Sequence, residues 1–333
     1  MLLNNKYVIW AMVLIIAAPV KGISQETKAF TAEQKAEVQK KLYAALQQAN
    51  PEYKGKADIK VDDSGAIFSV ALTDGAAAIA DISPLKGLPL KSVGLTRTKI
   101  KDLEPLRGMP LTVVYLQDNW ALTDISALEG TVLTDVALYN CKSVKDISSL
   151  KSSQLKHINF EGSAITDLSP LKGQPIEEAR ICCPVLDLSP LAGMPLRHVD
   201  VGGGTGNDKN FKDLSPLKGM TRMNDLRFDQ TSVSDISVIK DMKELKILAM
   251  FKTEVKDLSA IEGIELEALF FDPQNFPQEQ IKMVREMKSL KRIDNSWRSW
   301  PKGQPPETFW KRYDAGEFQK SPGTKMSNMP AVP

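Results

Sequence analysis

The ten residues DISPLKGLPL, at positions 81–90, recur along the chain and decide its fold. Close copies read DLSPLKGQPI at 167–176 and DLSPLAGMPL at 187–196, and a shorter copy reads DLSPLKGM at 213–220. The leading aspartate recurs at spacings of 20 to 26 residues, at Asp81, Asp102, Asp124, Asp146, Asp167, Asp187, Asp213, Asp235 and Asp257. A repeat of this length predicts a solenoid, because one unit cannot close a core alone whereas a stack of units can.

A second pattern follows each aspartate. In the first copy the apolar positions are Leu90, Val93 and Leu95, and the polar Thr98 follows three residues later. This alternation predicts a short strand with one buried face. The Ser-Pro step at Ser83 predicts a helical turn with serine as its N-cap, and Gly87 is expected to end that turn. Each unit is therefore predicted to supply one strand to a long parallel sheet.

The pattern L-x-x-L-x-L-x-x-(T/N/C) resembles the leucine-rich repeat family, and within it the 22-residue bacterial class of internalin-like proteins. The resemblance covers about residues 81–275. It implies an α/β fold, a right-handed leucine-rich-repeat solenoid with a concave parallel β-sheet. Pro184 and Gly204 replace the polar turn residue in the fifth and sixth copies, so those two units are expected to be irregular.

The flanking segments predict caps for the two ends of the solenoid. Residues 27–80 are predicted to be an N-terminal cap, made of a helix that begins with a capping box at Thr31 and a hairpin of strands at 59–61 and 67–72. Residues 276–318 are predicted to be a helical C-terminal cap, and 319–333 a disordered tail. The flanks look like those of bacterial repeat regions that some relatives attach to a protein kinase, but the kinase motifs are absent from this sequence.

The first residues predict export from the cytoplasm. Lys6 precedes an apolar run over 8–20, which is short for a membrane span, so residues 1–22 are predicted to be a signal peptide. The alternative is an uncleaved single-pass anchor, the one case in which membrane association is expected. Either way the predicted location is secreted, periplasmic or cell-surface. The formal net charge of +2 matches Lys6 and Lys21, so the remainder is close to neutral and no nucleic-acid partner is expected.

Residues that carry chemistry are few. His157 and His198 fall two repeats apart, roughly 10 Å, and Cys182 lies roughly 13 Å away, which is too far for a zinc site. Cys141 is predicted to be a buried structural thiol, and Cys182 to point from the concave face with an exposed thiol. The insertion at 202–210 lacks the residues that phosphate or calcium loops require. We therefore expect no metal, no cofactor and no enzymatic activity.

The repeat register predicts which residues face out of the concave sheet. A central column is listed as Gly94, Tyr115, Ala137, Asn159, Arg180, Asp200, Arg227, Ala249 and Phe270. An outer column is listed as Thr96, Gln117, Tyr139, Glu161, Cys182, Gly202, Asp229, Phe251 and Asp272. Aromatic residues and arginine are favoured as interface anchors.

The columns lead to a hypothesis in which a protein or peptide partner lies along the concave face. Its anchors are Tyr115 and Tyr139 at one end and Phe251 and Phe270 at the other, with polarity set by Arg180, Asp200 and Arg227. An equally weighted interpretation is that these three charges only form a cross-strand ladder. The alternative function is a carbohydrate-binding or cell-envelope structural protein that uses the terminal aromatics, which are Trp297, Trp300, Trp310 and Phe318.

Overall fold

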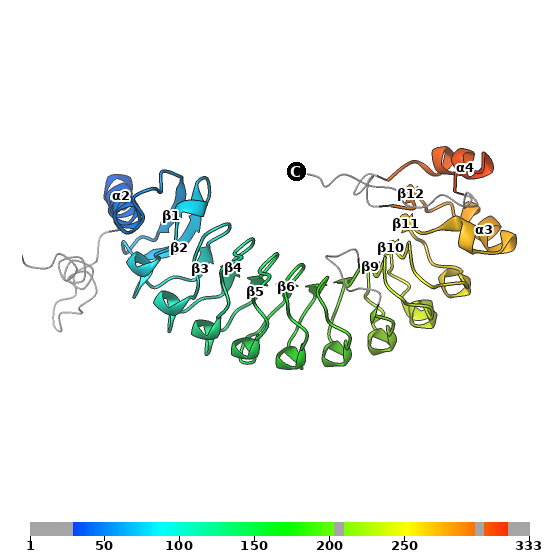
Figure 1. Ribbon diagram of the computed structural model, residues 1–333, viewed down its shortest axis with the longest axis horizontal. Helices are drawn as coiled ribbons and strands as arrows, with labels where there is room; N and C mark the ends of the chain where they lie inside the picture. Colours follow the sequence, from blue (N-terminus) through cyan, green and yellow to red (C-terminus); the bar gives the residue numbers. More distant parts are fainter. Residues whose placement is uncertain (1–28, 203–209, 297–302, 319–333) are drawn as a thin grey trace, which may run out of the picture.

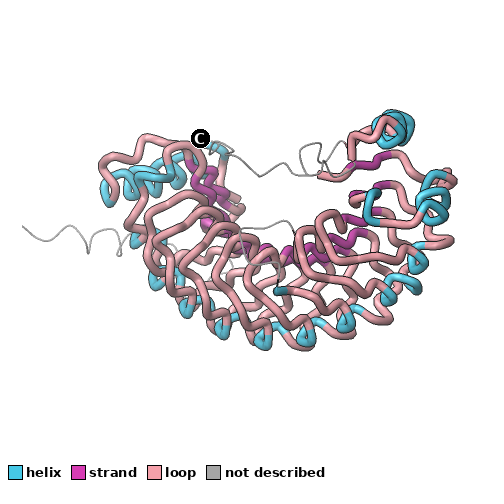
Figure 2. The backbone as a smooth tube through the Cα atoms, turned by 45° about the vertical axis from the view of Figure 1, so that its right-hand side comes forward, coloured by secondary structure: helices cyan, strands magenta, loops and turns pink. Residues whose placement is uncertain are grey.

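The computed structural model describes residues 29–202, 210–296 and 303–318. The repeats form a horseshoe whose inner edge is lined by strands and whose outer edge carries short helical turns (Figures 1 and 2). The strands belong to one twelve-stranded sheet in sequence order. Its first two strands, β1 (Ala57–Val61) and β2 (Ile67–Leu72), are antiparallel. The others pair in parallel and are β3 (Ser92–Gly94), β4 (Val113–Tyr115), β5 (Asp135–Ala137), β6 (His157–Asn159), β7 (Glu178–Arg180), β8 (His198–Asp200), β9 (Asp225–Arg227), β10 (Ile247–Ala249), β11 (Ala268–Phe270) and β12 (Arg292–Asp294).

Each repeat strand is three residues long and buries its middle residue. Val93, Val114 and Val136 lie in register on β3, β4 and β5 and are at most 2% exposed. The apolar residue that follows each of these strands, such as Leu95, is also buried in the core. The predicted alternation is therefore confirmed, and the residues on either side of the buried one face the concave surface.

The recurring aspartate lies two residues before each helical turn and accepts a hydrogen bond from the first residue of that turn. In the first repeat, Oδ1 of Asp81 accepts the backbone N–H of Ser83 at 2.7 Å. The same bond recurs from residue i+2 to the aspartate in all nine repeats. The expectation that Ser83 is the N-cap is wrong by one position, because it is the first residue of η2 (Ser83–Leu85). The equivalent 3₁₀ turns are η3 (Glu104–Leu106), η4 (Ser126–Leu128), η5 (Ser148–Leu150), η6 (Ser169–Leu171), η7 (Ser189–Leu191), η9 (Ser215–Leu217), η10 (Ser237–Asp241) and η11 (Ser259–Ile261).

Buried polar side chains close turns after the strands, as expected, although Pro184 takes this position after β7. Asn119 is fully buried, and its Oδ1 accepts the backbone N–H of Thr98 in the preceding repeat at 2.9 Å. Its Nδ2 donates to the carbonyls of Leu95 and Leu116, both at 2.7 Å. In the next repeat the Cys141 thiol donates to the carbonyl of Leu116 at 3.0 Å. These hydrogen bonds connect adjacent repeats at one edge of the sheet.

Both ends of the solenoid carry the expected caps. Helix α2 (Ala32–Ala49) begins with the predicted capping box at Thr31, and it packs with the β1–β2 hairpin beside the first repeat. Helices α3 (Gln278–Arg285) and α4 (Pro306–Asp314) lie at the other end of the horseshoe (Figure 1). A short turn adjoins each cap, η1 (Ala76–Ala78) at the first end and η12 (Pro273–Asn275) at the second. The domain limits at residues 80 and 275 stay predictions.

Several predictions from the sequence fall outside the described residues. These are the signal peptide at 1–22, the tail at 319–333, most of the insertion at 202–210 with Gly204, and the indoles of Trp297 and Trp300. Within the described ranges, none of the helices has the length and apolar character needed to cross a membrane.

Candidate binding face

Three columns of side chains, rather than two, face outward from the concave sheet. The predicted central column is confirmed by the strand register, in which Tyr115 pairs with Ala137, and Asp200 with Arg180 and Arg227. A first column precedes it by two residues on every strand and was missed. From β4 to β10 the first column is Val113, Asp135, His157, Glu178, His198, Asp225 and Ile247. The same alternation that gave the central column could have located it.

The open part of the face lies on β4 to β7. Tyr115 is 42% exposed, and the side chains of His157, Glu178 and Arg180 are exposed. Tyr139 is half-buried in the outer column beside them. Trp120, which the repeat register did not single out, is 66% exposed on the turn that follows β4. Of the predicted anchors, Tyr115, Tyr139 and Arg180 are therefore accessible.

The opposite end of the face is closed, which corrects the prediction for two anchors. Phe251 and Phe270 are 2% and 0% exposed and pack with Ala249 and Ala268 in a cluster separate from the main core. The chain of the C-terminal cap returns over this end, where Gln304 pairs with Ile293 of β12. Gly303 lies there as well, and a Cβ on it would be 3.7 Å from the ring of Phe270. These phenylalanines stabilise the closed end of the sheet and are not available to a partner in this structure.

Asp200 and Arg227 belong to a buried ionic network. Arg227 donates from Nε to Asp225 at 2.8 Å, and its Nη1 lies 3.6 Å from the Asp200 carboxylate. Burial raises the pKa of Asp200, although the neighbouring Arg227 opposes the rise. Burial also acts to raise the pKa of Asp225, but hydrogen bonds from His198 and Arg227 outweigh it and leave that pKa below its usual value. The ladder interpretation holds for Asp200 with Arg227; among the described residues no ion pair joins Arg180 to Asp200.

Each histidine of the first column is paired with an aspartate on a neighbouring strand. His157 Nδ1 lies 2.6 Å from Oδ1 of Asp135, and His198 Nδ1 lies 3.1 Å from Oδ2 of Asp225. The histidines are two strands apart, with Glu178 between them. Each imidazole is thus oriented by a carboxylate on the side away from Glu178.

The cysteines are all free and buried. The expected exposure of Cys182 is wrong, because it is 3% exposed and its thiol donates to Oδ1 of Asp200 at 3.2 Å. Burial, followed by the charge of Asp200, raises the pKa of that thiol well above its usual value. Cys141 is a buried structural thiol as predicted, and burial raises its pKa to about 11. Within the described ranges no three His, Cys, Asp or Glu side chains are grouped to hold a metal ion.

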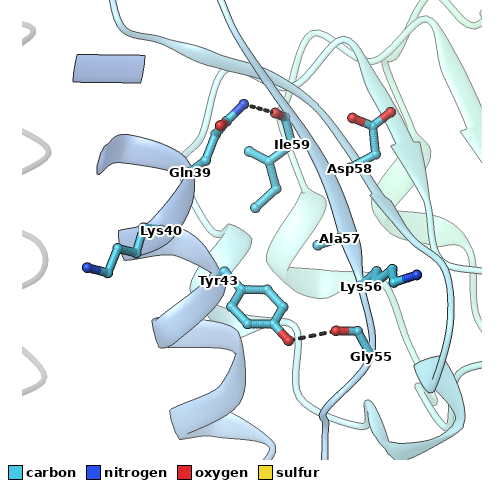
Figure 3. Close-up of a pocket in the computed structure, with 8 residues that line it drawn as sticks. All are labelled: Gln39, Lys40, Tyr43, Gly55, Lys56, Ala57, Asp58 and Ile59. Atoms are coloured by element: carbon cyan, nitrogen blue, oxygen red, sulfur yellow. Dashed lines mark hydrogen bonds between the residues drawn. The ribbon is translucent and has the colours of Figure 1, made fainter. Parts of the chain in front are cut away.

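A groove in the N-terminal cap, between α2 and β1, lies apart from these columns (Figure 3). Gln39 and Tyr43 line it from the helix. Each side chain donates to a backbone carbonyl, Gln39 to Ile59 and Tyr43 to Gly55, both at 2.6 Å. These polar groups fasten the helix to the hairpin, so the groove is part of the cap's own packing.

The described aromatic residues of the C-terminal cap pack on one another. Phe309 is fully buried, stacks on Phe318 and meets Trp310 edge to face at 5.0 Å. The guanidinium of Arg285 lies 4.7 Å from the Trp310 ring centre. One face of the Trp310 ring is thus covered by Arg285, and the ring packs within the cap.

No protein-family model matches the chain, and no curated protein sequence matches it significantly. Solved structures with a similar fold include the internalin InlF of Listeria monocytogenes, at 19% identity and a TM-score of 0.47 over 81% of this chain and 94% of that one. Internalin C2 of the same organism is 19% identical, with a TM-score of 0.45 over 69% and 92%. The Arabidopsis receptor kinase HAESA, solved with the peptide hormone IDA and the co-receptor SERK1, is 15% identical, with a TM-score of 0.48 over 72% and 46%.

The fold class follows from the repeat itself. Nine copies of one helical turn alternate with strands that pair in register, and buried polar side chains such as Asn119 close turns after the strands. This combination of sequence period, parallel concave sheet and outer 3₁₀ turns gives the chain the fold of a leucine-rich-repeat solenoid.

Proposed function

We propose that the chain is a non-enzymatic binding module that holds a protein or peptide partner on the open part of its concave face, β4 to β7. The observation that carries the proposal is the exposure of Tyr115 at 42% and Trp120 at 66%, whereas the other aromatic side chains of the described ranges are mostly packed. Exposed aromatics beside exposed charges are the composition favoured in protein interfaces. The location that fits this function is outside the cytoplasm, as the N-terminal segment predicts.

The partner would meet aromatic residues at one end of the open face and charges at the other. Tyr115 and Tyr139 lie on successive repeats and offer apolar rings with hydroxyl groups at their tips. Such side chains bury a large area at low entropic cost. Glu178 and Arg180 on β7 then supply charge at the far limit of the open face. Phe251 and Phe270 have no part in this proposal, because both side chains are buried.

A photo-crosslinking amino acid placed at Tyr115 tests the proposal. The purified mature chain would be incubated with cell-envelope and secreted proteins of the source cells, irradiated and analysed by mass spectrometry. We expect one discrete protein adduct, reduced severalfold when Trp120→Ala is added. The control carries the same group at Lys172, which is exposed beside an outer turn.

Two outcomes would count against the proposal. Equal yields of adduct from positions 115 and 172 would show that the partner does not prefer the concave face to the outer one. Retention of the chain on an array of purified glycans, lost in Trp310→Ala but not in Tyr115→Ala, would favour the carbohydrate-binding alternative.

A further inference from the structure

Strand β7 carries two exposed charges that the rest of the sheet leaves unpaired. Glu178 and Arg180 are both exposed and face the concave side, two residues apart. Within the ranges 29–202, 210–296 and 303–318, neither side chain makes a hydrogen bond or an ion pair. They stand out because the neighbouring charges of the first and central columns are paired.

Among the described residues Glu178 has no partner, and the Nδ1 atoms of both flanking imidazoles are turned to aspartates on the strands beyond them. His157 is held by Asp135 on β5, at 2.6 Å, on the side away from Glu178. His198 is held by Asp225 on β9, at 3.1 Å, also on the side away from Glu178. The row therefore runs Asp, His, Glu, His, Asp, and only its central carboxylate lacks a partner among the described residues.

Arg180 lacks a partner among the described residues in a similar setting. Its neighbour across the strand, Asp200, accepts from Cys182 and from the backbone N–H of Gly202, each at 3.2 Å, and pairs with Arg227. On the other side, Arg180 exerts an electrostatic influence on Glu161 without a direct contact. Arg180 thus keeps its five N–H donors directed to solvent or to a ligand.

We propose, on the basis of the proposed function, that β7 selects the partner by charge order. The ligand is an extended segment of a protein that sets a basic side chain against Glu178 and an acidic side chain against Arg180, two residues apart. Alternate side chains of an extended segment point to one side and are roughly 6.6 Å apart, which equals the spacing of two residues along β7. The match requires these three residues of the segment to run along the strand direction.

The mixed sign of the pair argues against ligands of a single charge. A polyanion attracted by Arg180 would be repelled by Glu178, and a polycation would meet the reverse. Charges across an interface contribute to specificity and register more than to raw affinity. A charge pair of fixed order therefore suits discrimination among peptides, while the aromatic residues Tyr115 and Trp120 supply the buried area.

A phage-displayed library of random 12-residue peptides tests this inference. Parallel selections would use the purified mature chain and its E178R/R180E variant, each checked by thermal unfolding. We expect the first selection to enrich one order of basic-x-acidic residues and the variant to enrich the opposite order. Single E178Q or R180Q substitutions should weaken the selected peptides roughly threefold to tenfold. The matched control is Lys172→Glu, an exposed charge change beside an outer turn, which should leave affinity unchanged.

The two levels of the proposal fail in different ways. Peptides that depend on Tyr115 but show no charge order, or the same order with both chains, would overturn the role of β7 and leave the binding face in place. Peptides that are unaffected by Tyr115→Ala, E178Q and R180Q alike would overturn the binding face itself. If E178R/R180E does not fold, the two single glutamine variants decide the question. E178Q should abolish the preference for a basic peptide residue, and R180Q should abolish the preference for an acidic one.

Discussion

Arg227 and Asp225 form a bidentate ion pair within one strand, two residues apart on the concave side of β9. Both side chains are 11% exposed, and the guanidinium also lies 3.6 Å from Asp200. The pair therefore places one arginine between two buried carboxylates. The electrostatic arrangement of the sheet from β8 to β9 depends on that arginine.

Replacing Arg227 by methionine should strongly destabilise the protein. The change keeps much of the side-chain volume but leaves Asp225 and Asp200 buried without their cation, and loss of one partner from a buried pair typically costs about 3–5 kcal/mol. Urea unfolding followed by circular dichroism measures the effect. The same change at the exposed Arg180 should stay within about 0.5 kcal/mol. Equal effects at the two positions would contradict the assignment of Arg227 to a buried network.

Asn119 is expected to be the most sensitive of the polar turn residues. Asn119→Ala would leave the N–H of Thr98 and the carbonyl of Leu95 without this partner in a buried site, whereas the carbonyl of Leu116 keeps its hydrogen bond from Cys141. Each buried group left unpaired costs roughly 1–3 kcal/mol, so the summed loss should exceed about 2 kcal/mol. Ser143→Ala, which removes one exposed hydrogen bond to the carbonyl of Trp120, is the control and should change the urea midpoint little.

The sequence was sufficient for the repeating parts of the molecule. The same local rule acts in every unit, so the buried positions of Val93 and Leu95 in one copy predict their equivalents in the others. Because the pattern recurs in nine copies, the assignment of each buried position is supported by several repeats. The assignment of Ser83 as N-cap was wrong by one position, because Ile82 is the N-cap and the side chain of Asp81 accepts the backbone N–H of Ser83, the first residue of the turn.

The parts that could not be predicted depend on contacts that do not repeat. Phe270 has the spacing of an open concave residue, yet Gly303, from the C-terminal cap, lies over it. Cys182 has the same outward position, but its thiol is buried and donates a hydrogen bond to the carboxylate of Asp200 on the next strand. Pairing of this kind depends on the chemistry of neighbouring repeats, which the shared motif does not constrain.

The capping aspartates should make the fold sensitive to acid. A hydrogen bond from the backbone N–H of Ser126, at the start of η4, lowers the pKa of Asp124 below its ordinary value of 3.8. The same cause lowers the pKa of four further caps, Asp167, Asp187, Asp235 and Asp257. Because the folded pKa is the lower one, this stabilisation is present above pH 3.8 and is lost as the pH falls through the folded values.

Substitution of all five of these aspartates by asparagine tests the acid sensitivity. Asparagine keeps the acceptor oxygen but does not titrate over this range, so the variant should lose less stability than the wild type between pH 5 and 2. Thermal unfolding across that interval measures the difference. Asp124→Ala, which removes one acceptor altogether, should cost about 1 kcal/mol at pH 7. A five-asparagine variant with the wild-type dependence on pH would rule out the caps as its source.

The three thiols should be inert while the chain is folded. Cys141, Cys182 and Cys183 are 0%, 3% and 7% exposed, and burial holds the pKa of the Cys141 thiol at about 11, so at pH 8 little of it is thiolate. With Ellman's reagent at pH 8 we expect no rapid release of chromophore from the native protein and three equivalents in guanidinium chloride. Lys172→Cys supplies an exposed thiol as the positive control and should add one rapid equivalent. If the wild type instead releases one rapid equivalent, and Cys182→Ser does not, the Cys182–Asp200 contact opens readily. The Cys182 thiol would then be accessible from the concave face.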